Sequence, residues 1–150
     1  GPADQARFRA LRHAVPVAIN EALSQRGVTK VATDSALPRG ATERWLAESR
    51  AWLDSQGLEH VAFGHIGDEH LHLNILARDA AQTPLARRAF GELTKRAVAA
   101  GGTVSAEHGL GKLKRDLLGM LYSPPVLARM QQIKLSLDPE AVLGRGTLLP

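Results

Sequence analysis

The sequence predicts an α+β fold: a ferredoxin-like cap, with an antiparallel sheet and helices on one face, followed by a helical C-terminal segment. Apolar residues recur at helical spacing in several long stretches, whereas shorter stretches have the period of two typical of strands. The order strand, helix, strand, strand, helix, with a tight hairpin between the middle strands, indicates the ferredoxin-like unit.

The first half of the chain should form a helix, a strand and a second helix. Residues 4–25 read as an amphipathic helix that Pro16 should kink or break, and a strand near residues 28–33 follows. A capping threonine begins the second helix, Thr42–Gln56, and Gly57 ends it.

The hairpin and the later helices follow. We expect strands at residues 60–64 and 70–77, and a helix over 84–100 that ends at a glycine pair. The C-terminal segment should be mostly helical, over residues 111–120 and 124–137.

Four of the six histidines lie in two short segments: His65, His70, His72 and His108. His70 and His72 are two residues apart, so on a strand both imidazoles point to one face. The turn residues Gly67-Asp68 let the chain fold back, which should bring His65 near His72. This spacing indicates a divalent metal site.

Glu107 is the best-placed carboxylate to complete a two-histidine, one-carboxylate set with His65 and His72. Imidazole and carboxylate suit zinc, manganese, iron or cobalt better than calcium or magnesium, and the spacing does not choose among them. Spacing alone is also compatible with an ordinary protein surface that binds no metal. In that alternative the histidines face solvent and Glu107 pairs with Lys112 or Lys114.

Two ordered motifs carry a resemblance to a known family. They read Gly-His-Ile-Gly-Asp-Glu-His-Leu-His-Leu-Asn from Gly64 and Gly-Gly-Thr-Val-Ser-Ala-Glu-His-Gly-Leu-Gly-Lys from Gly101; residues 33–38 and 133–139 also fit. From about Leu11 onward the chain resembles the C-terminal region of FAD-linked oxidases and dehydrogenases of the vanillyl-alcohol oxidase type. It is most similar to their D-2-hydroxy-acid group: D-lactate, glycolate-oxidase-subunit and D-2-hydroxyglutarate dehydrogenases.

The resemblance implies roles for individual residues. His65, His72 and Glu107 match the metal ligands of the family, with zinc first and manganese or iron as alternatives. His108 matches the histidine proposed as general base beside the flavin and the substrate. The alternative for His108 is a hydrogen bond that only orients Glu107.

Substrate-binding residues follow less directly from the resemblance. Arg12 and Lys30 are plausible matches for a basic substrate-binding residue, although an exposed cation is more often simply solvated. His70 shares the strand face of His72 and is a further candidate. Two departures stand out: Glu69 replaces a usual glycine, and Gly144–Thr147 replaces Asn-Pro-Gly-Lys.

The implied reaction is oxidation of a D-2-hydroxy acid to the 2-keto acid with FAD as cofactor. A chain of 150 residues suits one domain, and nothing in it resembles the glycine-rich segment of a flavin-binding half. We therefore expect residues 1–150 to be the C-terminal substrate and metal portion, which is inactive without a flavin domain. Its partners would be that domain and a small-molecule substrate, and a dimer is compatible with the sequence.

Composition excludes several other classes. The absence of cysteine excludes disulfides and thiolate metal ligands, and is compatible with a cytoplasmic location. No apolar stretch is long enough to span a bilayer, although the full-length enzyme could lie peripherally on one. The net charge of +4 comes from basic residues scattered among acids, and an aromatic content of 4% leaves few stacking platforms, which argues against nucleic-acid binding.

Three alternative functions remain. An ether-lipid synthase-like member of the superfamily should carry a histidine run where this chain has Ala106-Glu107. A binding module could use the histidines for a structural metal. A degenerate, non-catalytic domain is compatible with the altered C-terminal tail.

Overall fold

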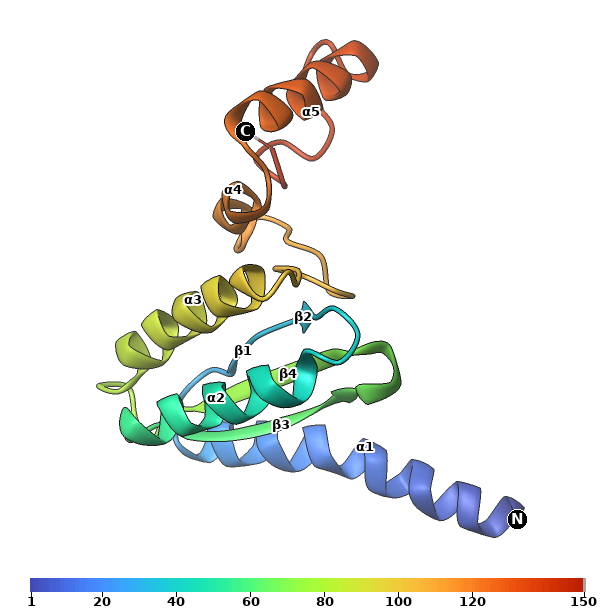
Figure 1. Cartoon of the computed structure of the whole chain (residues 1–150), viewed down its shortest axis with the longest axis vertical. Coiled ribbons are helices and arrows are strands. Elements are labelled where there is room, and N and C mark those ends of the chain that lie inside the picture. Colours follow the sequence, from blue (N-terminus) through green and yellow to red (C-terminus); the bar gives the residue numbers. More distant parts are fainter. Residues whose placement is uncertain (150) are drawn as a thin grey trace.

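A small antiparallel sheet with helices on both sides forms the body of the chain, which confirms the α+β class (Figure 1). The computed structural model describes residues 1–149. In chain order the helices and strands are α1 (Pro2–Gln25), β1 (Val31–Ala32), β2 (Ser35–Ala36), α2 (Thr42–Ser55), β3 (Glu59–His65), β4 (His70–Leu76), α3 (Thr83–Ala99), α4 (Leu118–Leu121) and α5 (Pro124–Leu137). Short 3-10 turns occupy Ile66–Asp68 and Arg115–Leu117.

Strand β4 is the centre of the sheet. Strand β3 pairs along one edge of β4, and the short strands β1 and β2 share the other edge. Between them, Thr33 stays bonded to Leu73: its N–H donates to the Leu73 carbonyl over 3.1 Å, and its hydroxyl accepts from the Leu73 N–H over 3.0 Å. The two short strands are therefore one interrupted edge strand.

The start of the predicted strand over residues 28–33 is wrong, because β1 begins only at Val31. Gly27 turns the chain with a left-handed φ of 66°, and the Val28 N–H then bonds back to the Leu23 carbonyl of α1 over 3.1 Å. The C-terminal cap of α1 thus uses the residues that the sequence assigned to the strand.

The segment after α3 runs beside β2, on the side away from β4. The Thr103 N–H donates to the Ala36 carbonyl over 2.9 Å, and the Ala36 N–H donates to the Thr103 hydroxyl over 3.1 Å. This segment takes the place of the fourth strand in a ferredoxin-like unit without forming a regular strand. It delivers residues 105–108 to the sheet face that carries the histidines.

The period of two in β4 divides its side chains between two faces. Leu71, Leu73 and Ile75 pack under α2 and α3, where Leu53 and Leu93 complete the main core. On the opposite face, α1 covers only one end of the sheet.

That cover consists of Ile19 and Leu23 packed against Leu76, supported by Val61 and Phe63 of β3. The rest of this face carries the polar residues of β4. Its openness is what allows a site to form there.

The C-terminal segment differs from the prediction in one place. A helix over residues 111–120 is wrong: a turn at 111–114 precedes the 3-10 turn and the four-residue α4. Gly111 adopts a left-handed φ of 54°, and Lys114 has a φ of −119° and a ψ of 11°, so the backbone leaves the helical conformation before Arg115. The predicted helix over 124–137 coincides with α5.

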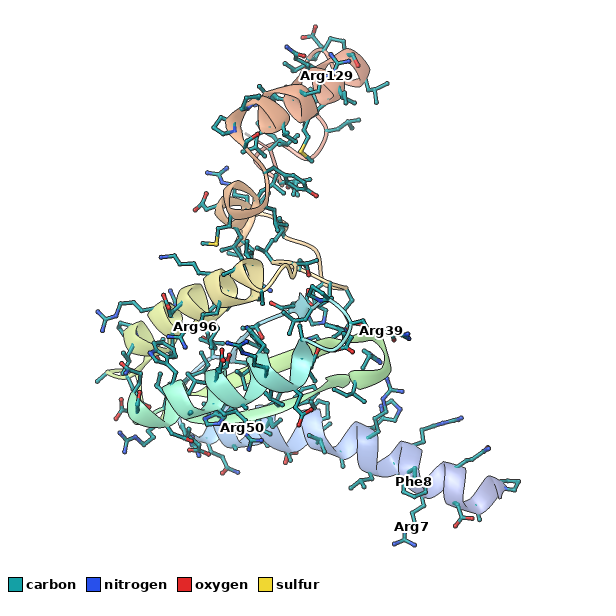
Figure 2. All side chains as sticks on the ribbon, viewed as in Figure 1. Arg7, Phe8, Arg39, Arg50, Arg96 and Arg129 are labelled. Atoms are coloured by element: carbon teal, nitrogen blue, oxygen red, sulfur yellow. The ribbon has the colours of Figure 1, made fainter. Side chains whose placement is uncertain are left out.

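Helix α1 is longer than predicted and continues through Pro16. Its N-terminal half extends beyond the sheet, and α4 and α5 project in another direction (Figure 1). Arg7 and Phe8 lie on this free half of α1 (Figure 2). Within residues 1–149, no helix combines the length and apolar character needed to cross a bilayer.

Candidate metal and substrate site

The β3–β4 hairpin places three histidines on one face of the sheet. In the strand register His65 lies opposite His70, and Phe63 lies opposite His72. The His65 and His70 rings stack with centroids 5.6 Å apart, and His70 meets His72 edge-on at 4.5 Å. His65 is therefore the direct neighbour of His70, and lies two residue pairs along the hairpin from His72.

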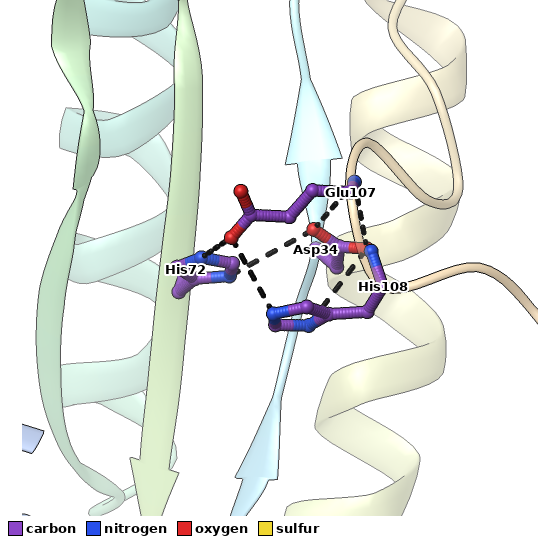
Figure 3. Close-up of side chains that lie close together, drawn as sticks. All are labelled: Asp34, His72, Glu107 and His108. Carbon is purple, nitrogen blue, oxygen red and sulfur yellow. Dashed lines mark hydrogen bonds and ion pairs between the residues drawn. The ribbon is translucent and has the colours of Figure 1, made fainter.

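The most defined contact joins His72 to Glu107. Their Nε2 and Oε1 atoms are 2.9 Å apart (Figure 3). Nδ1 of His72 lies 3.3 Å from the Thr33 carbonyl oxygen. A carbonyl oxygen can only accept, so Nδ1 carries the hydrogen. A carboxylate oxygen also accepts, so the 2.9 Å contact with Glu107 needs a hydrogen on Nε2. A metal ion that took the place of this hydrogen would have Nε2 and Oε1 as ligand atoms, while the backbone holds the other nitrogen of the ring.

Two further histidines converge on the Glu107 carboxylate. His65 Nε2 lies 3.5 Å from Oε2, and His108 Nε2 lies 3.4 Å from Oε1. The His108 ring stacks on His72, with centroids 4.8 Å apart and planes 6° from parallel. Desolvation alone would raise the pKa of Glu107, but the hydrogen bond to His72 and the nearby imidazoles, His70 first, outweigh it and lower that pKa.

Asp34 lies behind this cluster and is fully buried. Its carboxylate accepts hydrogen bonds from the His70 ring at 2.9 Å and from the Ser105 hydroxyl at 2.7 Å. It also accepts the backbone N–H groups of residues 106, 107 and 108, at 3.2, 3.3 and 2.9 Å to Oδ2. Burial would raise the pKa of Asp34, but these bonds, the Ser105 hydroxyl first, hold it well below its usual range.

Sequence reasoning missed Asp34. The available signal was an acidic residue directly after the predicted strand over 28–33, inside the stretch 33–38 that fits the family. A carboxylate in that position has to find buried donors.

The cluster forms the floor of an open groove of about 960 Å³. The predicted substrate residues Arg12 and Lys30 both line it, together with Arg87 and Lys114, which sequence reasoning did not assign. His70 does not line it: its ring is buried beneath the groove against Asp34. The groove thus presents four basic side chains around the histidines and one carboxylate, a suitable lining for an anion.

Two groups of side chains within the described residues bring their ligand atoms within 4.8 Å of one another: Asp34, His72, Glu107 and His108; and His65, His70 and Glu107. The predicted ligands His65, His72 and Glu107 are divided between these groups, which share Glu107. The oxygens of Asp34 are occupied by hydrogen-bond donors. The donors left over are imidazole nitrogens and a carboxylate, a set that suits zinc, manganese or iron.

Comparison with known proteins agrees with the two motifs. Residues 2–148 match the family described as FAD linked oxidases, C-terminal domain. The chain is 36% identical over 132 residues to mitochondrial D-2-hydroxyglutarate dehydrogenase of Bos taurus, a match covering 88% of this chain and 24% of that protein. It is 36% identical over 136 residues to D-2-hydroxyglutarate dehydrogenase of Xanthomonas citri pv. viticola, covering 87% and 28%.

A more distant relative is glycolate oxidase subunit GlcD of Bacillus subtilis, 26% identical over 129 residues, covering 85% of this chain and 27% of that protein. The chain thus spans about a quarter of the length of the curated relatives it matches.

Proposed function

Because this chain belongs to the C-terminal domain family of the FAD linked oxidases, we propose that it is the substrate- and metal-binding portion of an enzyme that oxidises a D-2-hydroxy acid to the 2-keto acid. The observation that carries the proposal is the 2.9 Å contact between His72 Nε2 and the Glu107 carboxylate on the floor of a basic groove. Such a site can hold a cation beneath an anionic substrate.

The work would be divided between this chain and a flavin domain outside it. FAD, held mainly by that domain, would supply the acceptor for the hydride that leaves the α carbon of the substrate. The residues of this chain would bind the substrate, orient it and take up the hydroxyl proton.

We assign the metal to His65, His72 and Glu107, with zinc first and manganese or iron as alternatives. A divalent ion bound there would polarise the substrate's hydroxyl and carboxylate groups. The Thr33 carbonyl supports the assignment, because it holds Nδ1 of His72 and so directs Nε2 toward Glu107.

His108 would accept the hydroxyl proton as general base. Its side chain is 57% exposed at the groove and stacks on His72, so a substrate on the floor can reach it. Arg12 and Lys30 would hold the substrate carboxylate from the α1 side of the groove. His70 is better suited to supporting the floor than to touching substrate, because its ring is buried and bonded to Asp34.

A structural metal in a binding module is the alternative function. Structural sites are usually closed by four protein ligands, whereas catalytic sites keep an open position. The side chains of Glu107 and His108 are 43% and 57% exposed to the groove, which favours the open, catalytic kind.

The test uses the protein that carries this chain together with its flavin domain. Anaerobic addition of D-2-hydroxy acids should bleach the flavin absorption, and the L-enantiomers should not. Dialysis against a chelator should abolish the bleaching, and readdition of zinc, manganese or iron should restore it. A flavin that no 2-hydroxy acid reduces would contradict the proposed reaction, and bleaching that survives complete metal removal would contradict the role of the metal.

A further inference from the structure

We propose that Asp34 is the positioning residue of the site: it fastens the Ser105–His108 segment to the sheet, so that Glu107 and His108 meet the hairpin histidines. The proposal rests in one respect on the proposed function, because it takes Glu107 as a metal ligand. Its geometric part does not depend on any metal.

The bonds to Asp34 join three separate parts of the chain. Asp34 lies between β1 and β2, His70 lies at the start of β4, and the remaining donors lie in the segment after α3. The donors from that segment are 71 to 74 residues away in sequence. One buried carboxylate is therefore the common point of the edge strand, the hairpin and the segment.

The three backbone N–H groups point at one oxygen of Asp34. Ala106, Glu107 and His108 are consecutive, and their N–H groups surround Oδ2 as the backbone surrounds an anion in a nest. A full negative charge is the acceptor that stabilises three converging donors. The side chains of Glu107 and His108 then leave this nest toward His72, where Figure 3 shows them.

Asp34 acts through other residues, without coordinating a metal itself. It belongs to a group with metal-ligand geometry, but Ser105, the nest and His70 occupy both of its oxygens. Turning either oxygen to a cation would leave buried donors unsatisfied. Its effect on a metal should therefore be that of a residue that orients ligands, whose loss lowers affinity by about 10- to 100-fold.

The experiment compares the unchanged chain with three variants. Asp34→Asn removes the charge, Ser105→Ala removes one donor while keeping the charge, and Asp116→Asn is the control, since that side chain is 98% exposed. Amide hydrogen exchange by NMR on the metal-free chain reports the nest at residues 106–108, with the amides of β4 as an internal reference. Cobalt titration in competition with a chelator reports affinity, and the cobalt absorption spectrum reports ligand geometry.

The expected result is exchange at residues 106–108 that is faster by about tenfold or more in Asp34→Asn, less so in Ser105→Ala, and unchanged in Asp116→Asn. Cobalt affinity should fall in the same order, with a changed spectrum. Exchange at 106–108 that matches the unchanged chain in Asp34→Asn, or equal acceleration throughout β4, would overturn the positioning role.

Two further outcomes are decisive. If Asp34→Asn does not fold, Ser105→Ala decides, and unchanged exchange at residues 106–108 in that variant would overturn the proposal. If the unchanged chain binds no cobalt while exchange still responds as expected, the positioning role stands and the metal site of the proposed function fails.

Discussion

His72 and Glu107 face each other across 35 residues of sequence, with Nε2 and Oε1 2.9 Å apart. His72 comes from the central strand, and Glu107 comes from the segment after α3. Thr33, on the edge strand between them, holds the other nitrogen of His72. The pair forms only if the hairpin, the edge strand and the later segment all fold together, so the site reports on the integrity of the whole sheet.

Arg12→Ala in the flavin-bearing protein should raise KM for the hydroxy acid by about 10- to 100-fold with little change in kcat, because the lost contact is to a bound carboxylate in ground state and transition state alike. Arg12 lines the groove. Arg7→Ala is the matched control, since Arg7 lies on the free half of the same helix (Figure 2). Steady-state kinetics measure both, and equal KM values for the two variants would contradict substrate binding by Arg12.

Glu69 stabilises the chain through its side chain and destabilises it through its backbone. The carboxylate accepts the Gly40 N–H over 2.9 Å, tying the hairpin turn to the entry of α2, while φ is held at 53°. Glu69→Ala loses the contact and keeps the strained conformation, whereas Glu69→Gly loses the contact and relieves the strain. Thermal unfolding should therefore place Tm of the alanine variant below that of the glycine variant by about 3 °C. Equal Tm values would show that the turn relaxes.

Asp138 should make the stability of the C-terminal segment depend on pH. The Lys134 ammonium 2.9 Å away, against some desolvation, lowers the pKa of Asp138, and the N–H groups of Val142 and Leu143 add to this effect. A lowered folded pKa stabilises the fold above the ordinary value of 3.8, and this stabilisation is lost as pH falls through the folded pKa.

The Tm deficit of Asp138→Asn should therefore be largest near neutrality and shrink below about pH 4. Thermal unfolding across pH measures this deficit. Asp116→Asn, at a 98% exposed position, is the control. A Tm deficit that stays constant down to pH 2 would indicate that the substitution disturbs local packing, and that the loss of the negative charge is not the cause.

The hairpin and its histidine face could be predicted because they depend on local pattern. A period of two and a turn at Gly67-Asp68 are enough to place His70 and His72 on one face. The helix predicted over 111–120 was wrong, because the sequence pattern does not reveal that Gly111 adopts a left-handed φ and that Lys114 leaves the helical region.

The role of Asp34 could not be predicted from the sequence, for a different reason. Its donors come from the segment after α3, which lies beside β2 only once the sheet has formed. Sequence spacing says nothing about such a convergence. The same holds for the groove, where Arg87 and Lys114 join Arg12 and Lys30.

The 150-residue chain purified alone should be colourless. Its sequence has nothing that resembles a glycine-rich pyrophosphate-binding segment, so flavin binding should require the separate domain. Absorption spectroscopy after dialysis, with added FAD as a challenge, measures this directly. A yellow chain that retains stoichiometric flavin would contradict the division of labour proposed above.

In the flavin-bearing protein, variants of His108 and variants of the metal ligands should lose activity in different ways. His108→Ala should retain metal and flavin but lose turnover by about 10²–10⁴-fold, the usual contribution of a positioned base. His72→Ala should lose metal and turnover together, with little recovery on adding metal. His13→Ala is the matched control, because His13 lines the groove outside both clusters.

Measuring the metal content together with kcat distinguishes the two possible roles of His108, general base or orienting residue. Near-normal turnover with reduced metal content in His108→Ala would make it a residue that orients Glu107, as its 3.4 Å contact with Oε1 allows. The base would then have to be sought elsewhere. His70 is a poor substitute as the structure stands, since its Nε2–H is held by Asp34 and its ring is buried. Retained metal with lost turnover is therefore the outcome that assigns proton transfer to His108.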